Sequence, residues 1–432
     1  MSSKRPIRQA LLAAAALLAA GTAQAAPEIQ QWTTDNGARV LFVRAPEIPM
    51  VDARVTFDAG AARDGGHPGI ARMVSNLLMS GTDRLDADAL AQAIEREGAE
   101  VSTGSARDMA WVEMRSLTGE EHLPEIADTV AAIVARPAFP EAEVARVRDQ
   151  QLTAIEEQAQ SPGSIARDRL WSALYGEHPY AHDPLGSPDS LERIGRAALG
   201  DFHGRYYVAA NANVAIVGDI DRARAERLAA TLVGGLPRGE AAPALPPVPR
   251  LEEDVTIREP FPSTQAHVLI GRPAVERGYA DWPALYVANH VLGGGGFTSR
   301  LFSEVREQRG LVYSIYSYVS PMAASGPFVV GLQTRGDQAE KALSIVREQL
   351  AGFAGSGPTA AEVEDAVKNI VGGFPLQVDS NGEISSYLSM MRLLRPAHGL
   401  PAPLPRGRAG RPAPTPRARH SARSSASARA SP

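Results

Sequence analysis

The 432-residue chain contains no cysteine, and this absence excludes several kinds of site at once. Disulfide bonds, thiolate metal ligands and cysteine nucleophiles are all impossible in this polypeptide. Hydrophobic residues make up 44% of the chain and charged residues 22%, which is an ordinary balance for a globular protein. A chain of this length is long enough for two or three domains and for a sizeable buried core.

Long hydrophobic runs are also absent, except near the N-terminus. There the apolar run ALLAAAALLAAG, residues 10–21, follows three basic residues and precedes the small-residue motif Ala23–Ala25. This order is typical of a secretory signal peptide with its cleavage site. The run is shorter than the ~20 residues that span a bilayer, which argues against a membrane anchor. We therefore expect residues 1–25 to be a signal peptide and the mature chain to be periplasmic, with no integral membrane segment.

Acidic residues are missing from both ends of the chain. The full chain has a net charge of −5, while residues 1–25 carry three positive charges and residues 392–432 carry nine, so residues 26–391 carry −17. An acidic body argues against nucleic acid as a partner. It is compatible with basic or unfolded peptide ligands.

The C-terminal segment 392–432 is rich in arginine, proline, alanine and serine and has no apolar periodicity. Such a segment buries too little apolar surface to fold. It is either a natural disordered tail or the product of a shifted reading frame in a GC-rich gene, and we favour the second explanation. In that case the second half of the protein lacks the final strand and helix that residues 199–236 supply in the first half.

The rest of the chain repeats one order of elements twice. Residues 240–250, EAAPALPPVPR, are rich in proline and alanine and are interpreted as a linker between domains at 26–239 and 251–391. The two predicted domains share a series of helices and paired strands, and both closing helices contain the letters AEV. This mixture predicts an α+β fold in which helices cover one face of a mainly antiparallel sheet.

Residues 69–82, GIARMVSNLLMSGT, predict an amphipathic helix, since apolar residues recur at i, i+3, i+4, i+7 and i+8. Arg72, Ser75 and Asn76 share the opposite face. This is the spacing of a zinc helix, in which two histidines one turn apart bind the metal and a glutamate between them acts on a water. Arg72, Ser75 and Asn76 are neither histidine nor glutamate, so the helix lacks the side chains of a zinc helix. Taken alone, the pattern is more simply that of an ordinary amphipathic helix.

The wider span 66–82 resembles the pitrilysin/insulinase family of inverzincin metallopeptidases, in which His-x-x-Glu-His precedes an apolar stretch and a Gly-Thr pair. Segments 178–194, 205–221 and 293–318 are similar to further parts of the family, in the family's order. The resemblance extends to the non-catalytic subunit of mitochondrial processing peptidase and to bacterial two-chain peptidases. It implies two homologous α+β halves that form a clam-like chamber; the composition of the C-terminal segment, as argued above, indicates that the second half is truncated.

The same resemblance implies a degenerate zinc site. Counting back from the Gly-Thr pair, the family's two histidines fall on Arg72 and Asn76 and its glutamate on Ser75, while its third ligand falls on Ala154, close to Glu156 and Glu157. Arginine repels zinc, serine is no general base at neutral pH, and asparagine is a poor zinc ligand. We therefore expect no metal and no other cofactor in this chain, and zinc in a partner chain.

In the family's second half, an arginine and a tyrosine hold the substrate carbonyl, and the resemblance assigns these roles to Arg306 and Tyr313. Both side chains are donors that stabilise charge on an attacked carbonyl. Gly310 ends the helix between them, so that the two can converge. From spacing alone, Arg306 is equally part of a solvated helix face and Tyr313 one of several strand aromatics.

The run Gly293, Gly294, Gly295 and Gly296 lacks the lysine of a phosphate loop. Two interpretations stay open. It is either a flexible lip over which an extended peptide passes, similar to the glycine-rich loop of the processing peptidase's non-catalytic subunit, or a plain helix terminator.

The sequence therefore favours a zinc-less subunit of a two-chain peptidase, inactive alone and paired as a heterodimer with a catalytic His-x-x-Glu-His subunit. It would supply Arg306 and Tyr313 and bind an extended peptide, in part by strand pairing along Val51–Phe57. The alternative is a structural or peptide-binding scaffold without a catalytic contribution. No serine nucleophile elbow is recognisable, which argues against an independent hydrolase. His178 and His182 are interpreted as loop residues, because Pro179 opposes a helix.

Overall fold

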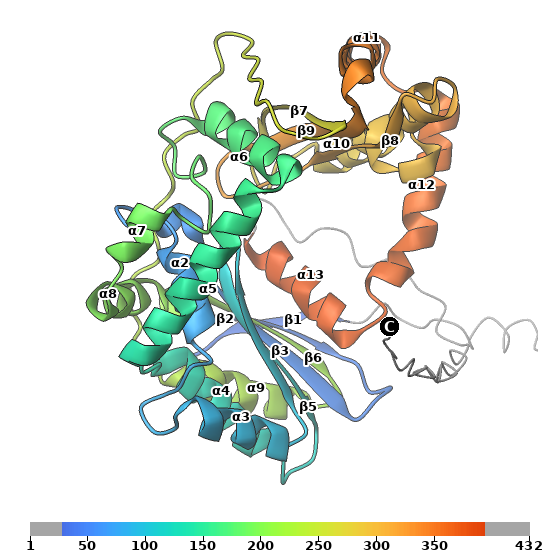
Figure 1. Ribbon diagram of the computed structural model, residues 1–432. Helices are drawn as coiled ribbons and strands as arrows, with labels where there is room; N and C mark the ends of the chain where they lie inside the picture. The colour runs from blue at the N-terminus through green and yellow to red at the C-terminus, as the bar shows by residue number, and fades with distance from the viewer. Residues whose placement is uncertain (1–27, 394–432) are drawn as a thin grey trace, which may run out of the picture.

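The computed structural model describes residues 28–393 (Figure 1). The predicted signal peptide and nearly all of the predicted tail lie outside the described residues. Two sheets, each associated with helices, make up this part of the chain. Among the described helices, none is both long enough and apolar enough to cross a membrane.

The first half is built on a mixed sheet whose strands follow the order β1-β2-β6-β3-β5-β4. Neighbouring strands are antiparallel, except that β2 and β6 run parallel. β6 is buried along its whole length, as expected for a central strand with apolar residues on both faces. The bounds are β1 Gln30–Thr33, β2 Arg39–Arg44, β3 Met50–Phe57, β4 Glu100–Ser105, β5 Ala110–Leu117 and β6 Ala212–Gly218.

Apart from α6, the helices of the first half bury apolar residues in one large core with this sheet. Several begin at a polar cap: the side chains of Asp86, Ser161 and Asp221 accept hydrogen bonds from backbone N–H groups of the first turn. The bounds are η1 Ala61–Arg63, α2 Ile70–Leu77, α3 Ala87–Arg96, α4 Leu123–Ala135, α5 Glu141–Ala159, α6 Pro162–Tyr175, α7 Pro188–Glu192, α8 Arg196–Tyr206, η2 Ala209–Asn211 and α9 Arg222–Gly234.

The second half has an antiparallel sheet of order β7-β9-β8, formed by β7 Gln265–Val275, β8 Val312–Val319 and β9 Gly326–Arg335. A smaller core lies beneath it. Two of its helical segments, η3 and η5, are π-helical. The bounds are α10 Trp282–Asn289, η3 His290–Gly294, η4 Gly296–Thr298, η5 Phe302–Glu307, η6 Gly336–Gln338, α11 Ala339–Ser356, α12 Ala360–Gly373, η7 Phe374–Gln377 and α13 Asn381–Leu393.

Each half covers one face of the other half's sheet with a helix. α6 of the first half packs on β7, where Leu170 and Leu174 lie against Gly271. α13 of the second half packs on β3 and β6, where Leu388 joins an apolar cluster on the first sheet (Figure 1). This reciprocal arrangement confirms the predicted α+β fold of two related halves.

A buried carboxylate fastens the two halves together. Asp108 of the first half accepts hydrogen bonds from the Tyr180 hydroxyl at 2.5 Å and from the Ala323 backbone N–H at 2.9 Å, and it pairs with Arg277 at 2.7 Å. The Tyr180 hydroxyl in turn accepts from the Ala324 N–H at 3.0 Å. The turn between β8 and β9 is thereby held against the first half.

The strand Val51–Phe57 forms as predicted, but its predicted pairing with a peptide is wrong. β3 is hydrogen-bonded to β5 on one side and to β6 on the other, so neither edge is free for a peptide. The second sheet differs from the first, because residues 237–264 form neither helix nor strand and three strands are present within the described residues. Truncation of the second half stays a prediction.

Candidate functional site

Arg306 is positioned by the local folding of η5. Leu301, Phe302 and Val305 pack into the core of the second half, so that Arg306, the next residue, faces outward. η5 ends at Glu307, and the turn after it closes at Gly310, whose φ of +60° favours glycine. The Gly310 N–H donates to the Arg306 carbonyl at 2.9 Å and closes the last turn. The chain then reverses into β8.

Tyr313 owes its direction to a β-bulge. In the β8–β9 ladder, Val312 pairs with Thr334 and Ser314 pairs with Gln333, which leaves Tyr313 as the extra residue. A bulge bends the strand and redirects the side chain of the inserted residue. The Tyr313 side chain is 76% exposed, although it lies between strand residues that are buried or half-buried.

The structure brings Arg306 and Tyr313 together. The Arg306 guanidinium carbon lies 5.9 Å from the centre of the Tyr313 ring, 4.7 Å from that of Phe302 and 6.0 Å from that of Phe297. Cation–π contacts of this kind hold the guanidinium in place without neutralising its charge. Within residues 28–391, no carboxylate pairs with Arg306. An uncompensated cation and an exposed phenol therefore share one surface.

The four glycines lie beside this pair. η3 packs closely on β8, and a Cβ on Gly293 would lie 2.5 Å from the Ser317 Oγ, while a Cβ on Gly294 would lie 2.6 Å from the Asn289 Nδ2. Gly293 is buried, whereas Gly294 and Gly296 are exposed. The run ends a helix, as one interpretation expected, and leads directly into Phe297. Its predicted role as a peptide lip stays a prediction.

The predicted zinc-site positions lie on α2 and α5, two helices of the first half that pack together. The Arg72 guanidinium donates to the Ser105 carbonyl of β4 at 3.4 Å, Ser75 is completely buried, and Asn76 is exposed. Ala154 is half-buried on α5. The side chains at these positions face different surroundings.

These side chains do not fit a zinc ion. Arg72 brings a positive charge. The Ser75 Oγ has no hydrogen-bond partner among the described residues, and the Ser75 backbone carbonyl already accepts a hydrogen bond from the Thr103 hydroxyl. Zinc requires three nitrogen, sulfur or carboxylate ligands with a position left for water. Within the described part of the chain, no group of three histidine, aspartate or glutamate residues is placed to hold a metal.

Sequence reasoning missed the residues that support α2. The buried Asp64 carboxylate accepts from the Gly69 N–H at 2.7 Å and from the Ala71 N–H at 3.0 Å, and it contacts the His182 Nε2 at 3.1 Å. It thus caps the first turn of the helix. Burial raises the pKa of Asp64, against the opposing effect of His182. The available signal was an acidic residue shortly before the helix start.

The two loop histidines have structural partners. His178 and His182 lie in the irregular segment 176–187, as predicted. The His178 Nε2 contacts the Pro246 carbonyl at 3.0 Å, and its Nδ1 accepts from the Tyr180 N–H at 3.1 Å. Both rings therefore hold loops together, within the described residues.

Comparison with known proteins gives a consistent result. Residues 39–188 match the insulinase family, peptidase family M16, and residues 193–370 match the peptidase M16 inactive domain. The chain is similar to the crystal structure of a peptidase M16 inactive domain from Pseudomonas fluorescens, with a TM-score of 0.82 and 38% sequence identity. The match covers 85% of this chain and 88% of the Pseudomonas chain.

Curated relatives agree with this match. The chain is 25% identical to the uncharacterized zinc protease YmxG of Bacillus subtilis, over 86% of this chain and 89% of that protein. It is 26% identical to a Helicobacter pylori protein named non-peptidase homolog YmxG, over 81% of this chain and 80% of that protein. The predicted relationship is confirmed: the chain belongs to peptidase family M16, the insulinase family.

Proposed function

We propose that this chain is the zinc-less subunit of a two-chain M16 peptidase that works in the periplasm. It binds extended peptides and supplies Arg306 and Tyr313 to the active site of a partner that carries His-x-x-Glu-His and holds the zinc. Residues 1–25 direct its export. The exposed Gly294 and Gly296 border the path of the peptide.

One observation carries the proposal: Arg306 and Tyr313 converge on an exposed surface, whereas α2 has lost its ligand set. The guanidinium lies against three aromatic rings, and among the residues with described side chains no acid neutralises it. Two of these rings, Phe297 and Tyr313, are 74% and 76% exposed. Exposed aromatic rings around an unpaired cation have no evident role in stabilising the fold of this half.

The chemistry of the pair suits carbonyl recognition. A guanidinium and a phenol both donate hydrogen bonds to a carbonyl oxygen, and these bonds strengthen when negative charge develops on that oxygen. Tyr313 stands on β8, an edge strand of its sheet within the described residues, where a peptide backbone can pair with the strand. Phe297 offers apolar contact to a neighbouring side chain of the peptide.

The test is reconstitution with an M16 subunit that carries the intact motif. The purified chain alone should neither bind zinc stoichiometrically nor cleave peptides, and the pair should do both. The double variant Arg306→Ala/Tyr313→Phe should lower kcat by roughly 10²–10³-fold, the range for loss of a charge-stabilising donor, while zinc content stays unchanged. Arg309→Ala, which removes a nearby arginine already paired with Glu304, is the matched control and should have little effect.

A scaffold role makes a different prediction in the same experiment. If the pair needs this chain for activity but the double variant retains the full kcat, the chain acts as a scaffold and the catalytic part of the proposal is wrong. Cleavage by the isolated chain would contradict both.

A further inference from the structure

The backbone around Phe297 is fixed, although the side chain is 74% exposed. Gly296 has a φ of +59°, a left-handed conformation that favours glycine and turns the chain just before Phe297. The Thr298 hydroxyl donates to the Gly295 carbonyl at 3.0 Å. The hydroxyl of Ser299, a completely buried residue, donates to the Gly296 carbonyl at 2.8 Å. The short helix η4 therefore presents Phe297 in one direction.

That direction is toward Arg306. The Phe297 ring meets the Phe302 ring edge to face, with 4.9 Å between the ring centres and 90° between the ring planes. The Arg306 guanidinium carbon lies 4.7 Å from the centre of the Phe302 ring and 6.0 Å from that of Phe297. Phe302 is the base of this arrangement, because it is only 7% exposed and belongs to the core of the second half. Phe297 is the exposed ring that closes one side of the guanidinium.

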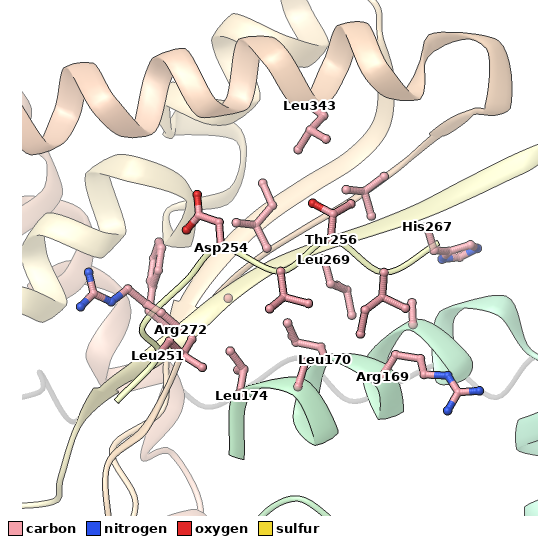
Figure 2. Close-up of a pocket in the computed structure, with 18 of the residues that line it drawn as sticks. Arg169, Leu170, Leu174, Leu251, Asp254, Thr256, His267, Leu269, Arg272 and Leu343 are labelled. Carbon is pink, nitrogen blue, oxygen red and sulfur yellow. The ribbon is translucent and has the colours of Figure 1, made fainter. Parts of the chain in front are cut away.

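The exposure of Phe297 is unrelated to the large cavity of the second half. That cavity has a volume of about 1690 Å³ and lies along β7, between α6 and α11 (Figure 2). Figure 2 shows Leu269 of β7 between Leu170 of α6 and Leu343 of α11. Neither Phe297 nor Arg306 is among the described residues that line the cavity. A gap in the apolar packing of this half therefore does not explain why the Phe297 ring is in contact with water.

An arginine side chain needs support before it can stabilise a reacting carbonyl efficiently. It has several rotatable bonds, and fixing them for the reaction costs conformational entropy. A donor that is already aimed at the developing charge avoids this cost at the moment of reaction. Among the residues with described side chains, no carboxylate pairs with Arg306, so the aromatic rings supply its orientation.

We infer that Phe297 is a positioning residue, which holds the Arg306 guanidinium against Phe302 and aims its N–H groups at the peptide carbonyl. The inference rests on the function proposed above and adds a residue to it. Phe297 acts through Arg306, so this role is separate from apolar contact with the peptide. Its aromatic ring is the required feature, because the face of the ring attracts a cation and an aliphatic side chain does not.

The first test needs only the isolated chain. Butanedione modifies arginine side chains that it can reach, and peptide mapping by mass spectrometry follows each arginine separately. Phe297→Ala should raise the rate of modification of Arg306 at least ~3-fold, because the guanidinium loses one of its rings and moves more freely. Arg309, which pairs with Glu304 at 2.7 Å, is the internal reference and should keep its rate. Because Phe297 is 74% exposed, the variant keeps its fold.

The second test measures kcat and KM of the reconstituted pair. Phe297→Ala and Phe297→Leu should both lower kcat ~3–10-fold, whereas Phe297→Trp, which keeps an aromatic face, should retain it. Leucine preserves apolar contact with a peptide, so Phe297→Leu should leave KM nearly unchanged. Tyr279→Ala, which removes another exposed aromatic ring of the second half, is the matched control and should leave kcat unchanged.

A double-mutant cycle shows whether Phe297 acts through Arg306. In an Arg306→Ala background, Phe297→Ala should not lower kcat further, since the group that it positions is gone. A residue that only stabilised the fold would lower kcat in both backgrounds, and urea unfolding would record the loss of stability.

Four results would overturn the inference. Arg306 could react with butanedione at the same rate in Phe297→Ala as in the unchanged chain, or Phe297→Leu could keep the full kcat. Phe297→Trp could lose as much activity as Phe297→Ala, or the effects of Phe297→Ala and Arg306→Ala on kcat could be additive. Failure of the proposed function looks different: Arg306→Ala/Tyr313→Phe would keep the full kcat, while the butanedione rates of the isolated chain would still decide whether Phe297 holds Arg306.

Discussion

The guanidinium carbon of Arg306 lies 5.9 Å from the centre of the Tyr313 ring, and two local features of the backbone create this relationship. Gly310, with φ of +60°, lets η5 turn back into β8. The bulge at Tyr313 then redirects that side chain toward solvent on the side of Arg306. A turn and a bulge, the second set by pairing with β9, therefore place a cation and a phenol side by side.

Gly310→Ala tests this turn. A Cβ at Gly310 meets no atom within 4 Å, so the cost comes from the backbone and should be about 1–2 kcal/mol of unfolding free energy, the penalty for a left-handed residue. In the reconstituted pair, activity should fall because Tyr313 loses its position. Urea denaturation measures the first effect and peptide cleavage the second. Gly352→Ala, within the exposed face of α11, should instead raise stability by ~0.5–1 kcal/mol.

Asp108→Ala tests the junction between the halves. The substitution leaves Arg277 and Tyr180 without their buried partner, and breaking a buried pair in this way costs ~3–5 kcal/mol. The control is Glu340→Ala, which removes an exposed ion pair with Arg258 and should cost less than ~1 kcal/mol. Urea unfolding followed by tryptophan fluorescence compares them. Similar losses in both variants would show that Asp108 does not fasten the halves.

His178 should make stability depend on pH. Burial lowers its pKa below the ordinary value of 6.5, so the folded protein holds the neutral ring, whose two nitrogens bond Pro246 and Tyr180. This stabilisation is fully present above pH 6.5 and is lost as the pH falls below 6.5 toward the folded-state pKa, because the unfolded chain then binds more protons.

His178→Gln removes this titration. Urea midpoints measured across that pH range should fall less steeply for the variant than for the unchanged chain. Part of the dependence should remain, because burial also lowers the pKa of His203. Identical slopes for the two proteins would show that His178 makes no contribution.

Restoring the missing ligands tests the assignment of α2 and α5. The variant Arg72→His/Asn76→His/Ala154→Glu should gain one zinc per chain by elemental analysis after dialysis, since it regains three ligands. The double variant without Ala154→Glu should not bind zinc. If the double variant binds zinc, the third ligand is Glu156 or Glu157, and the assignment of Ala154 is wrong.

Much of the fold could be predicted because its signals are local. The apolar periodicity of residues 69–82 predicted α2, and the duplication predicted two related halves. The convergence of Arg306 and Tyr313 also followed from nearby residues. The exchange of α6 and α13 between halves could not be predicted, because an amphipathic helix shows an apolar face but not which sheet covers it.

Other features could not be predicted from the sequence, because they depend on contacts between distant parts of the chain. Asp64 meets His182 across 118 positions of sequence, and no local pattern reports such a contact. β3 was predicted as a strand, yet its central place depends on β6, more than a hundred residues later. Its sequence alternates apolar and polar residues, so it gave no sign that both edges of the strand are paired. The bulge at Tyr313 depends on the register with β9.

The central claim is that α2 keeps the form of a zinc helix without its ligands, and metal content tests it most directly. The purified mature chain would be saturated with zinc, dialysed and analysed for bound metal, with the triple-ligand variant as a positive control. The account predicts no stoichiometric zinc in the unchanged chain. One tightly held zinc per unchanged chain would contradict it.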